Sequence, residues 1–322
     1  MKTELREKGE AFTQYNLITD ETDSTLVTPK RTIRRVPAGK QVMARMMMLR
    51  KRTKNASTPG PDGISWRVWK ILKNTRLGRD ALQDAAQCGR LLAEQLPRWR
   101  EAKITMIPKP GKDHALVKSW RPITLSNTIG KLAEKLVAEE VQRHEELCHE
   151  GAFADRKGRG AIDSVMLAKS MLQEYDDLRI VGRDIRSAFN GLRRSVIAEI
   201  LEKHHPLQQW VMEFLRSRTV DIWVDGKVAY TTTMTAGTPQ GSPLSPSLSS
   251  IYASEMVWRA QRNLQQQALR RRSSMRLQRT PAEDRIFPMS YIDDINTLVP
   301  RTTRTSTWHE QLDEVAESVM LT

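Results

Sequence analysis

Two adjacent carboxylates near the end of the chain are the residues whose types and spacing most favour chemistry. Asp293 and Asp294 lie between two apolar runs, and this pattern predicts a tight turn between two strands. Two like charges in an apolar setting repel each other, and a divalent cation that prefers hard oxygen ligands, such as Mg²⁺, would neutralise them. A third carboxylate, Asp184, follows the apolar run Leu178-Arg-Ile-Val181. If they converge, the three could hold two metal ions that activate a hydroxyl and stabilise a leaving phosphate.

Each aspartate taken alone also has an ordinary structural explanation. Asp is common in turns and at the ends of strands and helices, where its side chain accepts hydrogen bonds from the backbone. A catalytic interpretation therefore depends on all three residues, and on elements that bring Asp184 to the same place as Asp293 and Asp294.

The segments that must position these residues alternate between helical and extended patterns. Apolar spacing predicts helices over residues 79–96, 128–147 and 161–175, and a further helix from about Leu192. Extended runs are expected over Lys103–Lys109, over Trp120–Leu125 and on both sides of Asp225-Gly226, which is a strong hairpin signal. A Gly/Pro loop over 237–246 opens a helix expected to reach about residue 272. Mixed helices and hairpins predict an α+β fold.

The charge of the chain favours a polyanionic partner. Fifty-two Lys and Arg against thirty-eight Asp and Glu leave a net charge of +14. Residues 30–54 hold ten basic residues and residues 259–279 hold seven, with no acidic residue in either stretch. They are either two phosphate-binding stretches or two solvated, flexible segments, and charge alone does not decide between them.

Several classes of protein are excluded by composition. No run reaches the roughly eighteen or more apolar residues of a membrane-spanning helix, and the polar start of the chain does not resemble a secretory signal. Two cysteines, Cys88 and Cys148, provide neither a disulfide framework nor a zinc site. These features predict reduced thiols, no membrane partner and a nuclear or cytoplasmic location, or both.

Five motifs, taken in order, resemble those of a reverse transcriptase. They are similar to the motifs of LINE-type (non-LTR) retrotransposons in particular, with a fungal character, and span roughly residues 50–300. The motifs are Thr58-Pro-Gly-Pro-Asp-Gly63, Ile107-Pro-Lys with Trp120-Arg-Pro-Ile, Arg183-Asp-Ile-Arg-Ser-Ala-Phe-Asn190, Thr238-Pro-Gln-Gly-Ser-Pro-Leu-Ser-Pro246 and Tyr291-Ile-Asp-Asp294. Any one of them is weak, but their shared order makes coincidence very unlikely.

The resemblance implies roles for the carboxylates and their neighbours. Asp184 and Asp293 match the principal metal ligands, Asp294 assists them, and the backbone carbonyl of Ile185 is a further ligand. The cofactor implied is Mg²⁺, as two ions, with Mn²⁺ as an alternative. Phe189 matches a bulky gate that clashes with a ribose 2′-hydroxyl and so favours deoxynucleotides; ordinary core packing is the other interpretation of this residue.

The resemblance also implies which residues contact nucleotides and nucleic acid. Gln240 and Gly241 match the loop beneath the incoming nucleotide, where glycine allows close backbone approach and Gln both donates and accepts. The expected triphosphate clamp consists of Lys103, Lys109 and Arg121, although Lys103 suits an exposed basic hairpin equally well. Template contacts are expected from Arg156 and Arg159 in a fingers loop, and from Arg270, Arg271 and Arg272 in the second basic stretch.

The domain organisation implied is that of a right-hand polymerase. A basic, partly disordered lead-in over 1–55 is expected to precede fingers over 56–178 and a palm over 179–322, with a basic helical segment over 255–280. Because the sequence ends at Thr322, we expect an incomplete palm and no thumb, as in a truncated element product.

The function implied is RNA-directed DNA polymerisation, with an RNA template, a DNA primer and target, and dNTPs as partners. A primer 3′-hydroxyl attacks the α-phosphate of a dNTP in this reaction, and we expect weak or undetectable activity of this segment alone. Two alternatives stay open. One is an inactive, nucleic-acid-binding remnant of a retrotransposon polymerase, and the other is a domesticated or intron-type reverse transcriptase.

Overall fold

The structure is a computed structural model that describes residues 57–88, 97–185, 188–224, 226–274, 286–301 and 305–319. These residues form helices and strands in two compact units, each built from two separate stretches of chain. Unit 1 contains the described residues up to Glu140 together with Leu201–Ser245. Unit 2 contains Val141–Ile200 together with those from Pro246 onward. The predicted α+β class is confirmed.

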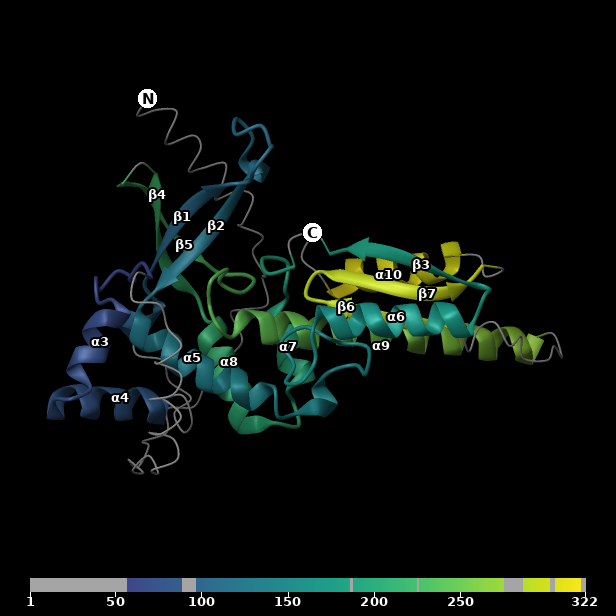
Figure 1. Cartoon of the computed structure of the whole chain (residues 1–322), viewed down its shortest axis with the longest axis horizontal. Coiled ribbons are helices and arrows are strands. Elements are labelled where there is room, and N and C mark those ends of the chain that lie inside the picture. Colours follow the sequence, from purple (N-terminus) through teal and green to yellow (C-terminus); the bar gives the residue numbers. More distant parts are fainter. Residues whose placement is uncertain are drawn as a thin grey trace. The chain divides into compact units, whose positions relative to one another are not determined.

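Unit 1 combines helices with a four-stranded sheet (Figure 1). Strand order is β2-β1-β4-β5, with antiparallel pairs at both edges and a parallel pair, β1 with β4, in the middle. The strands are β1 (Ala102–Pro108), β2 (Trp120–Ser126), β4 (Arg218–Val224) and β5 (Lys227–Met234). The helices are α3 (Trp66–Leu72), α4 (Arg76–Cys88), α5 (Thr128–Val141) and α8 (His205–Leu215), and short 3₁₀ turns span Pro97–Arg100 and Val117–Ser119.

The central strands of unit 1 pack on one another through alternate side chains. Ala102 and Ile104 of β1 form a buried cluster with Val220 and Ile222 of β4, as expected where successive residues point to opposite faces. The intervening residues Lys103 and Thr105 belong to the other face. The sheet therefore buries one face of β1 and leaves Lys103 only partly covered.

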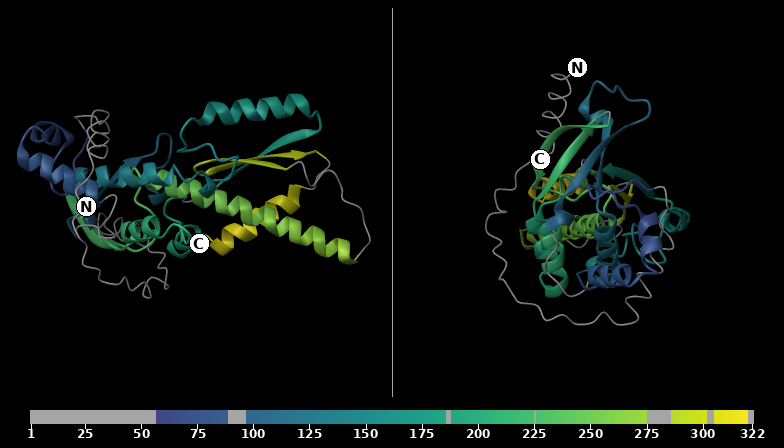
Figure 2. Two further views of the ribbon diagram at one scale, coloured as in Figure 1. Left: turned by 90° about the horizontal axis from the view of Figure 1, so that it is seen from below. Right: turned by 90° about the vertical axis from the view of Figure 1, so that its left-hand side faces the viewer.

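Unit 2 is a layered arrangement around a three-stranded antiparallel sheet of order β3-β7-β6. Helix α6 covers one face of the sheet, while α9 and α10 lie on the other (Figure 2). The strands are β3 (Leu178–Asp184), β6 (Phe287–Tyr291) and β7 (Asp294–Pro300). The helices are α6 (Ala161–Glu174), α7 (Arg194–Ile200), α9 (Ser245–Ser274) and α10 (Thr305–Val319), with a 3₁₀ turn at Glu145–Leu147.

The core of unit 2 forms where α6 meets the sheet. Ala168 of α6 packs with Leu178, Met289 and Leu298, one from each strand. On the opposite face, Trp308 of α10 is buried and its indole N–H donates to the Thr297 hydroxyl at 3.0 Å. Helices thus pack on both faces of the sheet, although most of the edge strand β3 is exposed, with Ile180 at 49%.

Most sequence-predicted elements are present, with several differences at their limits. The helix expected over 128–147 ends at Val141, where a 3₁₀ turn follows. Of the helix expected over 79–96, α4 accounts for the part to Cys88, and residues 89–96 lie outside the described residues, as does the lead-in over 1–55. Helices α8 and α10 were not predicted. None of the helices that the structure describes is long and apolar enough to cross a membrane.

Candidate active site

The three predicted aspartates of unit 2 come together at one end of its sheet. Strands β3 and β7 pair so that Asp184 lies opposite Asp294, and Cα atoms of directly opposed antiparallel residues are about 4.5–5.5 Å apart. Asp293 belongs to the two-residue turn between β6 and β7, and its carbonyl accepts a hydrogen bond from the Ile185 N–H at 2.7 Å. A residue from the middle of the chain is thereby fixed beside a pair near its end.

The turn that carries Asp293 has an unusual backbone. Ile292 has a φ of 58°, which places a β-branched residue in the left-handed region, where such residues are rare. A conformation of this kind costs on the order of 1–3 kcal/mol and persists where surrounding structure holds it in place. Here the surrounding structure is the pairing of β6 with β7 and the bond from Ile185. The strain coincides with the carboxylate cluster.

The electrostatics of the cluster suit a bound cation. The pKa of Asp294 is raised, first by partial desolvation of this exposed carboxyl and then by the negative charges of Asp293 and Asp184, which oppose its ionisation. Carboxylate oxygens are hard ligands of the kind that Mg²⁺ takes, and a divalent cation would relieve this mutual repulsion. The donor set therefore fits a divalent metal, with Ile185 half-buried beside it.

Phe189 follows the carboxylate strand in unit 2. It lies in a turn with Ala188 and Asn190, five positions after Asp184, and is half-buried. Residues 186 and 187 lie outside the described residues. The structure thus keeps Phe189 close in sequence to Asp184 and partly accessible, and its gating role remains a prediction.

In unit 1, the loop that carries Gln240 and Gly241 is attached to strand β2. The Thr124 N–H donates to the Gln240 carbonyl at 2.6 Å. Gly241 has a φ of 112°, and a Cβ atom added there would lie 2.7 Å from the Thr124 carbonyl oxygen. Only glycine satisfies both the backbone conformation and the close approach, so the predicted need for glycine at this position has a structural cause.

The three predicted triphosphate residues are distributed along the β1–β2 hairpin. Lys103 lies opposite Leu125, while Arg121 lies opposite Ile107, four residues or about 13 Å farther along the strand. The Lys103 ammonium lies 4.6 Å from the centroid of the Trp223 ring, whereas that of Lys109 donates to the Lys118 carbonyl at 2.9 Å. Lys103 therefore shares the Gln240 end of the hairpin, and Lys109 and Arg121 share the other.

Arg156 and Arg159 support their own loop in unit 2. The Arg156 guanidinium donates to the carbonyls of His149 at 3.1 Å and Ala152 at 3.3 Å, and that of Arg159 donates to the Glu150 carbonyl. Asp155, with a φ of 52°, accepts a hydrogen bond from the Ser247 hydroxyl of α9. Both arginines thus have a structural role besides any contact with nucleic acid.

The second basic stretch is described only in part. Arg270, Arg271 and Arg272 belong to the backbone of α9, which is helical as predicted, but their side chains lie outside the described residues. Of the segment expected over 255–280, the part beyond Ser274 is outside them as well.

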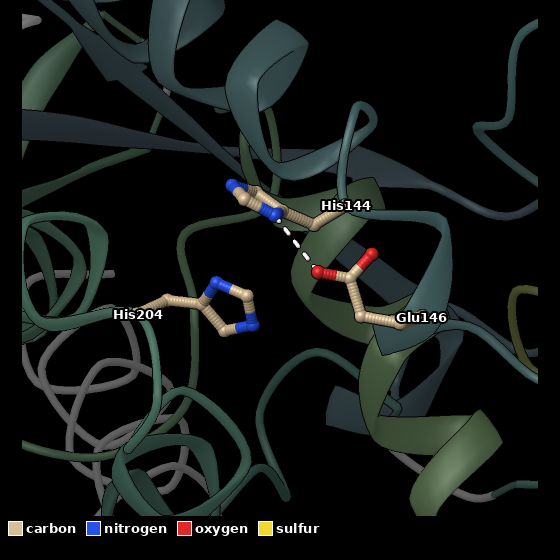
Figure 3. A group of neighbouring side chains, drawn as sticks. All are labelled: His144, Glu146 and His204. Carbon is tan, nitrogen blue, oxygen red and sulfur yellow. Dashed lines mark hydrogen bonds and ion pairs between the residues drawn. The ribbon is translucent and has the colours of Figure 1, made fainter.

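One histidine–carboxylate pair in unit 2 lies apart from the predicted residues. His144 Nδ1 is 3.0 Å from Glu146 Oε1 (Figure 3). The two residues are separated by only one position, and Glu146 is exposed. An exposed pair of this kind contributes about 0–1 kcal/mol, and it is not part of the carboxylate cluster.

A buried acidic residue of unit 1 was missed by sequence reasoning. Glu134 of α5 is only 2% exposed, and its Oε2 accepts a hydrogen bond from the Ser242 hydroxyl at 2.8 Å, next to Gly241. A signal was available, because Glu134 interrupts the apolar positions Leu132, Ala133 and Val137 of the same helix. Its partner in the Gly/Pro loop could not be identified from sequence.

Comparisons with known proteins agree with these motifs. The family model described as reverse transcriptase (RNA-dependent DNA polymerase) matches residues 107–322. A probable RNA-directed DNA polymerase from transposon BS of Drosophila melanogaster is 29% identical over 168 residues, which are 49% of this chain and 18% of that protein. The retrovirus-related Pol polyprotein from type-1 retrotransposable element R2 of Popillia japonica is 26% identical over 252 residues, 74% of this chain and 32% of that protein.

The chain therefore spans less than a third of the length of these two relatives. Among solved structures, apo telomerase from Candida tropicalis, truncated from its C-terminal domain, matches at 12% identity with a TM-score of 0.45. That match covers 79% of this chain and 52% of the telomerase chain.

Proposed function

Because this chain belongs to the reverse transcriptase (RNA-dependent DNA polymerase) family, we propose that it is an RNA-directed DNA polymerase region of a LINE-type retrotransposon protein. The observation that carries the proposal is the pairing of Asp184 with Asp294 beside the strained turn at Ile292. Carboxylates gathered at one end of a sheet repel one another, and a divalent cation would relieve this repulsion.

The proposed reaction joins a nucleotide to a primer. The primer 3′-hydroxyl attacks the α-phosphate of a dNTP, a new phosphodiester bond forms, and pyrophosphate leaves. Asp184, Asp293, Asp294 and the carbonyl of Ile185 would hold divalent ions, which as two Mg²⁺ would activate the hydroxyl and neutralise the leaving phosphate. The contribution of the carboxylates is to fix positions and balance charge, which are the main protein contributions to phosphoryl transfer.

Other residues would select and hold the nucleotide. Phe189 would exclude a ribose 2′-hydroxyl by steric contact. Gln240 and Gly241 would approach the nucleotide through a loop whose backbone is already fixed on β2, and Lys103 would offer a charge at the same end of the hairpin. Lys109 and Arg121 would contact phosphates farther out. We propose fingers over 56–178, which supply the basic residues of the hairpin, and a palm over 179–322, which supplies the carboxylates, Phe189 and the Gln240 loop.

The nucleic acids would be an RNA template and a DNA primer or target. The net charge of +14 supports polyanion binding, and Arg156, Arg159 and Arg270–Arg272 are the proposed contacts. The same charge favours the second candidate function, a non-catalytic nucleic-acid-binding remnant. The two candidates differ in whether the carboxylates catalyse a reaction.

Primer extension on an RNA template tests the proposal. We expect incorporation that requires Mg²⁺ or Mn²⁺ and falls by roughly a hundredfold or more in Asp293→Asn, because metal-assisted charge stabilisation is worth several kcal/mol. Asp176→Asn, an exposed acid of the same unit, serves as the control and should retain activity. Salt-sensitive RNA binding without incorporation by the wild-type chain would refute the polymerase and support the remnant.

A further inference from the structure

Glu134 is a buried acid that the proposed reaction does not use. It lies in α5 at 2% exposure, and burying a carboxylate is costly unless it is paired and hydrogen-bonded. Its pKa is raised, above all by burial, while the charges of Arg218 and Lys131 and a hydrogen bond from Ser242 act in the opposite direction. Burial of an acid near opposite charges is weak grounds for stability, since apolar residues of similar volume often serve as well. The residue therefore calls for another explanation.

The contacts of Glu134 lead to the loop that carries Gln240 and Gly241. The Ser242 hydroxyl donates to Glu134 Oε2 at 2.8 Å and accepts from the Leu244 N–H at 3.1 Å. The Ser242 N–H donates to the Pro239 carbonyl at 3.1 Å, which closes the backbone turn around Gln240 and Gly241. The turn closes at Ser242, and Glu134, which lies outside the loop, holds the Ser242 side chain in place.

A second attachment holds the same turn from the opposite end. The Thr124 N–H of β2 donates to the Gln240 carbonyl at 2.6 Å. The turn at Gln240 and Gly241 is therefore fixed between a strand and a helix, by one backbone bond and by the bond from Ser242 to the buried Glu134 side chain.

We propose that Glu134 is a positioning residue, which through Ser242 holds Gln240 and Gly241 in the orientation that receives the incoming nucleotide. The nucleotide part of this inference rests on the proposed function. The positioning part rests only on the contacts of α5, β2 and the loop, so the two parts can be tested separately.

Amide hydrogen exchange tests the positioning part without any activity. The informative amides are Thr124 and Ser242, because their hydrogen bonds join the loop but do not use the Ser242 hydroxyl. We expect Glu134→Ala and Ser242→Ala each to speed their exchange roughly tenfold, the equivalent of about 1.4 kcal/mol. Glu134→Gln, whose amide oxygen still accepts the Ser242 hydroxyl, should stay within about threefold of wild type.

The control is Glu140→Ala, which removes an exposed acid from the same helix and should leave both amides unchanged. If Glu134→Ala does not fold, Ser242→Ala decides alone, because it removes the same bond from the loop side. Exchange at Thr124 and Ser242 that is as slow in Ser242→Ala as in the control would overturn the inference.

Nucleotide kinetics test the second part. Ser242→Ala should raise the KM for dNTP roughly tenfold with little change in kcat, since it loosens a binding loop and leaves the carboxylates of unit 2 intact. Glu134→Gln should restore a KM near that of wild type. A wild-type chain that incorporates no nucleotide would refute the proposed function, and the exchange result at Thr124 would still decide whether Glu134 positions the loop.

Discussion

At the scale of single residues, two backbone conformations mark the places where chemistry is proposed. Ile292 adopts a left-handed conformation in the turn before Asp294. Gly241 has a positive φ, and a Cβ atom at this position would clash with the Thr124 carbonyl. The backbone at Ile292 is strained because the residue is β-branched, whereas the backbone at Gly241 is not, because glycine has no Cβ atom. Both belong to turns whose neighbours are tied to strands by backbone hydrogen bonds.

Gly241→Ala should destabilise the protein by about 2–4 kcal/mol, because the new Cβ would both approach the Thr124 carbonyl and require a positive φ. Gly63→Ala is the matched control: its φ of 68° is also positive, but nothing lies within 4 Å of an added Cβ. Denaturant unfolding measures both. Equal losses of stability in the two variants would show that close approach to Thr124 contributes nothing.

Phe189→Ala should weaken discrimination between dNTP and rNTP by roughly tenfold or more, since the proposed selection is a steric one. The measurement is the ratio of kcat/KM for the two sugars in single-nucleotide incorporation. Phe287→Leu, a half-buried aromatic of the same unit that packs on the core, is the control and should keep the wild-type ratio. An unchanged ratio in Phe189→Ala would assign Phe189 to packing.

At the scale of elements, the loop over 149–160 is held against β6 and α9 by polar contacts. His149 is buried, and its Nδ1 accepts a hydrogen bond from the Gly151 N–H at 3.0 Å. Gly151 and Phe153 exchange backbone hydrogen bonds with Ser290 of β6, next to Tyr291. The protonation of His149 therefore affects a loop that is hydrogen-bonded to β6, the strand that precedes Asp293 and Asp294.

Acid should destabilise this loop through His149. Its pKa is lowered, chiefly by burial and further by Arg156, against opposing contributions from Glu150 and Gln261. The unfolded chain therefore takes up a proton below about pH 6.5 while the folded chain resists, so stability falls as the pH drops through this range. Melting temperatures at pH 7.5 and pH 5.5 measure the effect.

His149→Asn should reduce the loss of stability between pH 7.5 and pH 5.5, because it removes the titrating ring. His205→Gln, at an exposed histidine, should lose as much as wild type. If His149→Asn and wild type lose the same amount, His149 does not account for the acid sensitivity.

The same elements show how far the sequence could predict the structure. The strands around Asp184 and Asp293 were predictable because each is a short apolar run that ends in a turn. The pairing of these strands with each other was not predictable, because nothing in the local sequence of residues 178–184 specifies residues 294–300 as the partner strand. Arg183 illustrates the limit: it directly precedes Asp184, and only the structure shows its ion pair with Asp313 of α10 at 3.0 Å.

The candidate site residues were proposed from motif order, whereas their support could not be. Motif order pointed to the carboxylates and the Gln240 loop as candidates, but not to the residues that hold that loop in place. Glu134 and Asp155 were missed because their partners, Ser242 and Ser247, are distant in sequence. Arg156 and Arg159 are predicted as template contacts, and only the structure shows that their guanidiniums donate to nearby backbone carbonyls. The separation of Lys103 from Arg121 follows from strand register, which motif spacing does not give.

At the scale of the whole molecule, the dominant property is an excess of positive charge. The net charge of +14 should make RNA affinity fall steeply with salt. Replacing Arg270, Arg271 and Arg272 together with Ala should reduce the slope of log K against log salt by about 2 for single-stranded RNA, if all three contact phosphates. Fluorescence anisotropy at several salt concentrations measures this slope.

A single-site control distinguishes contact from net charge. Lys169→Ala removes an exposed cation from α6, a helix with no proposed contact to nucleic acid, and should leave the slope unchanged. A triple-arginine variant with the wild-type slope would remove this stretch from the proposed RNA-binding surface.

The proposed function depends above all on Asp184, Asp293 and Asp294 acting as one divalent-metal site. Titration with Mn²⁺, followed by electron paramagnetic resonance, tests this dependence and needs only the carboxylates of unit 2. We expect Asp184→Asn and Asp293→Asn each to weaken Mn²⁺ binding roughly tenfold or more, while Asp176→Asn binds as wild type does. Equal Mn²⁺ affinity in all four proteins would show that the three aspartates do not form a metal site.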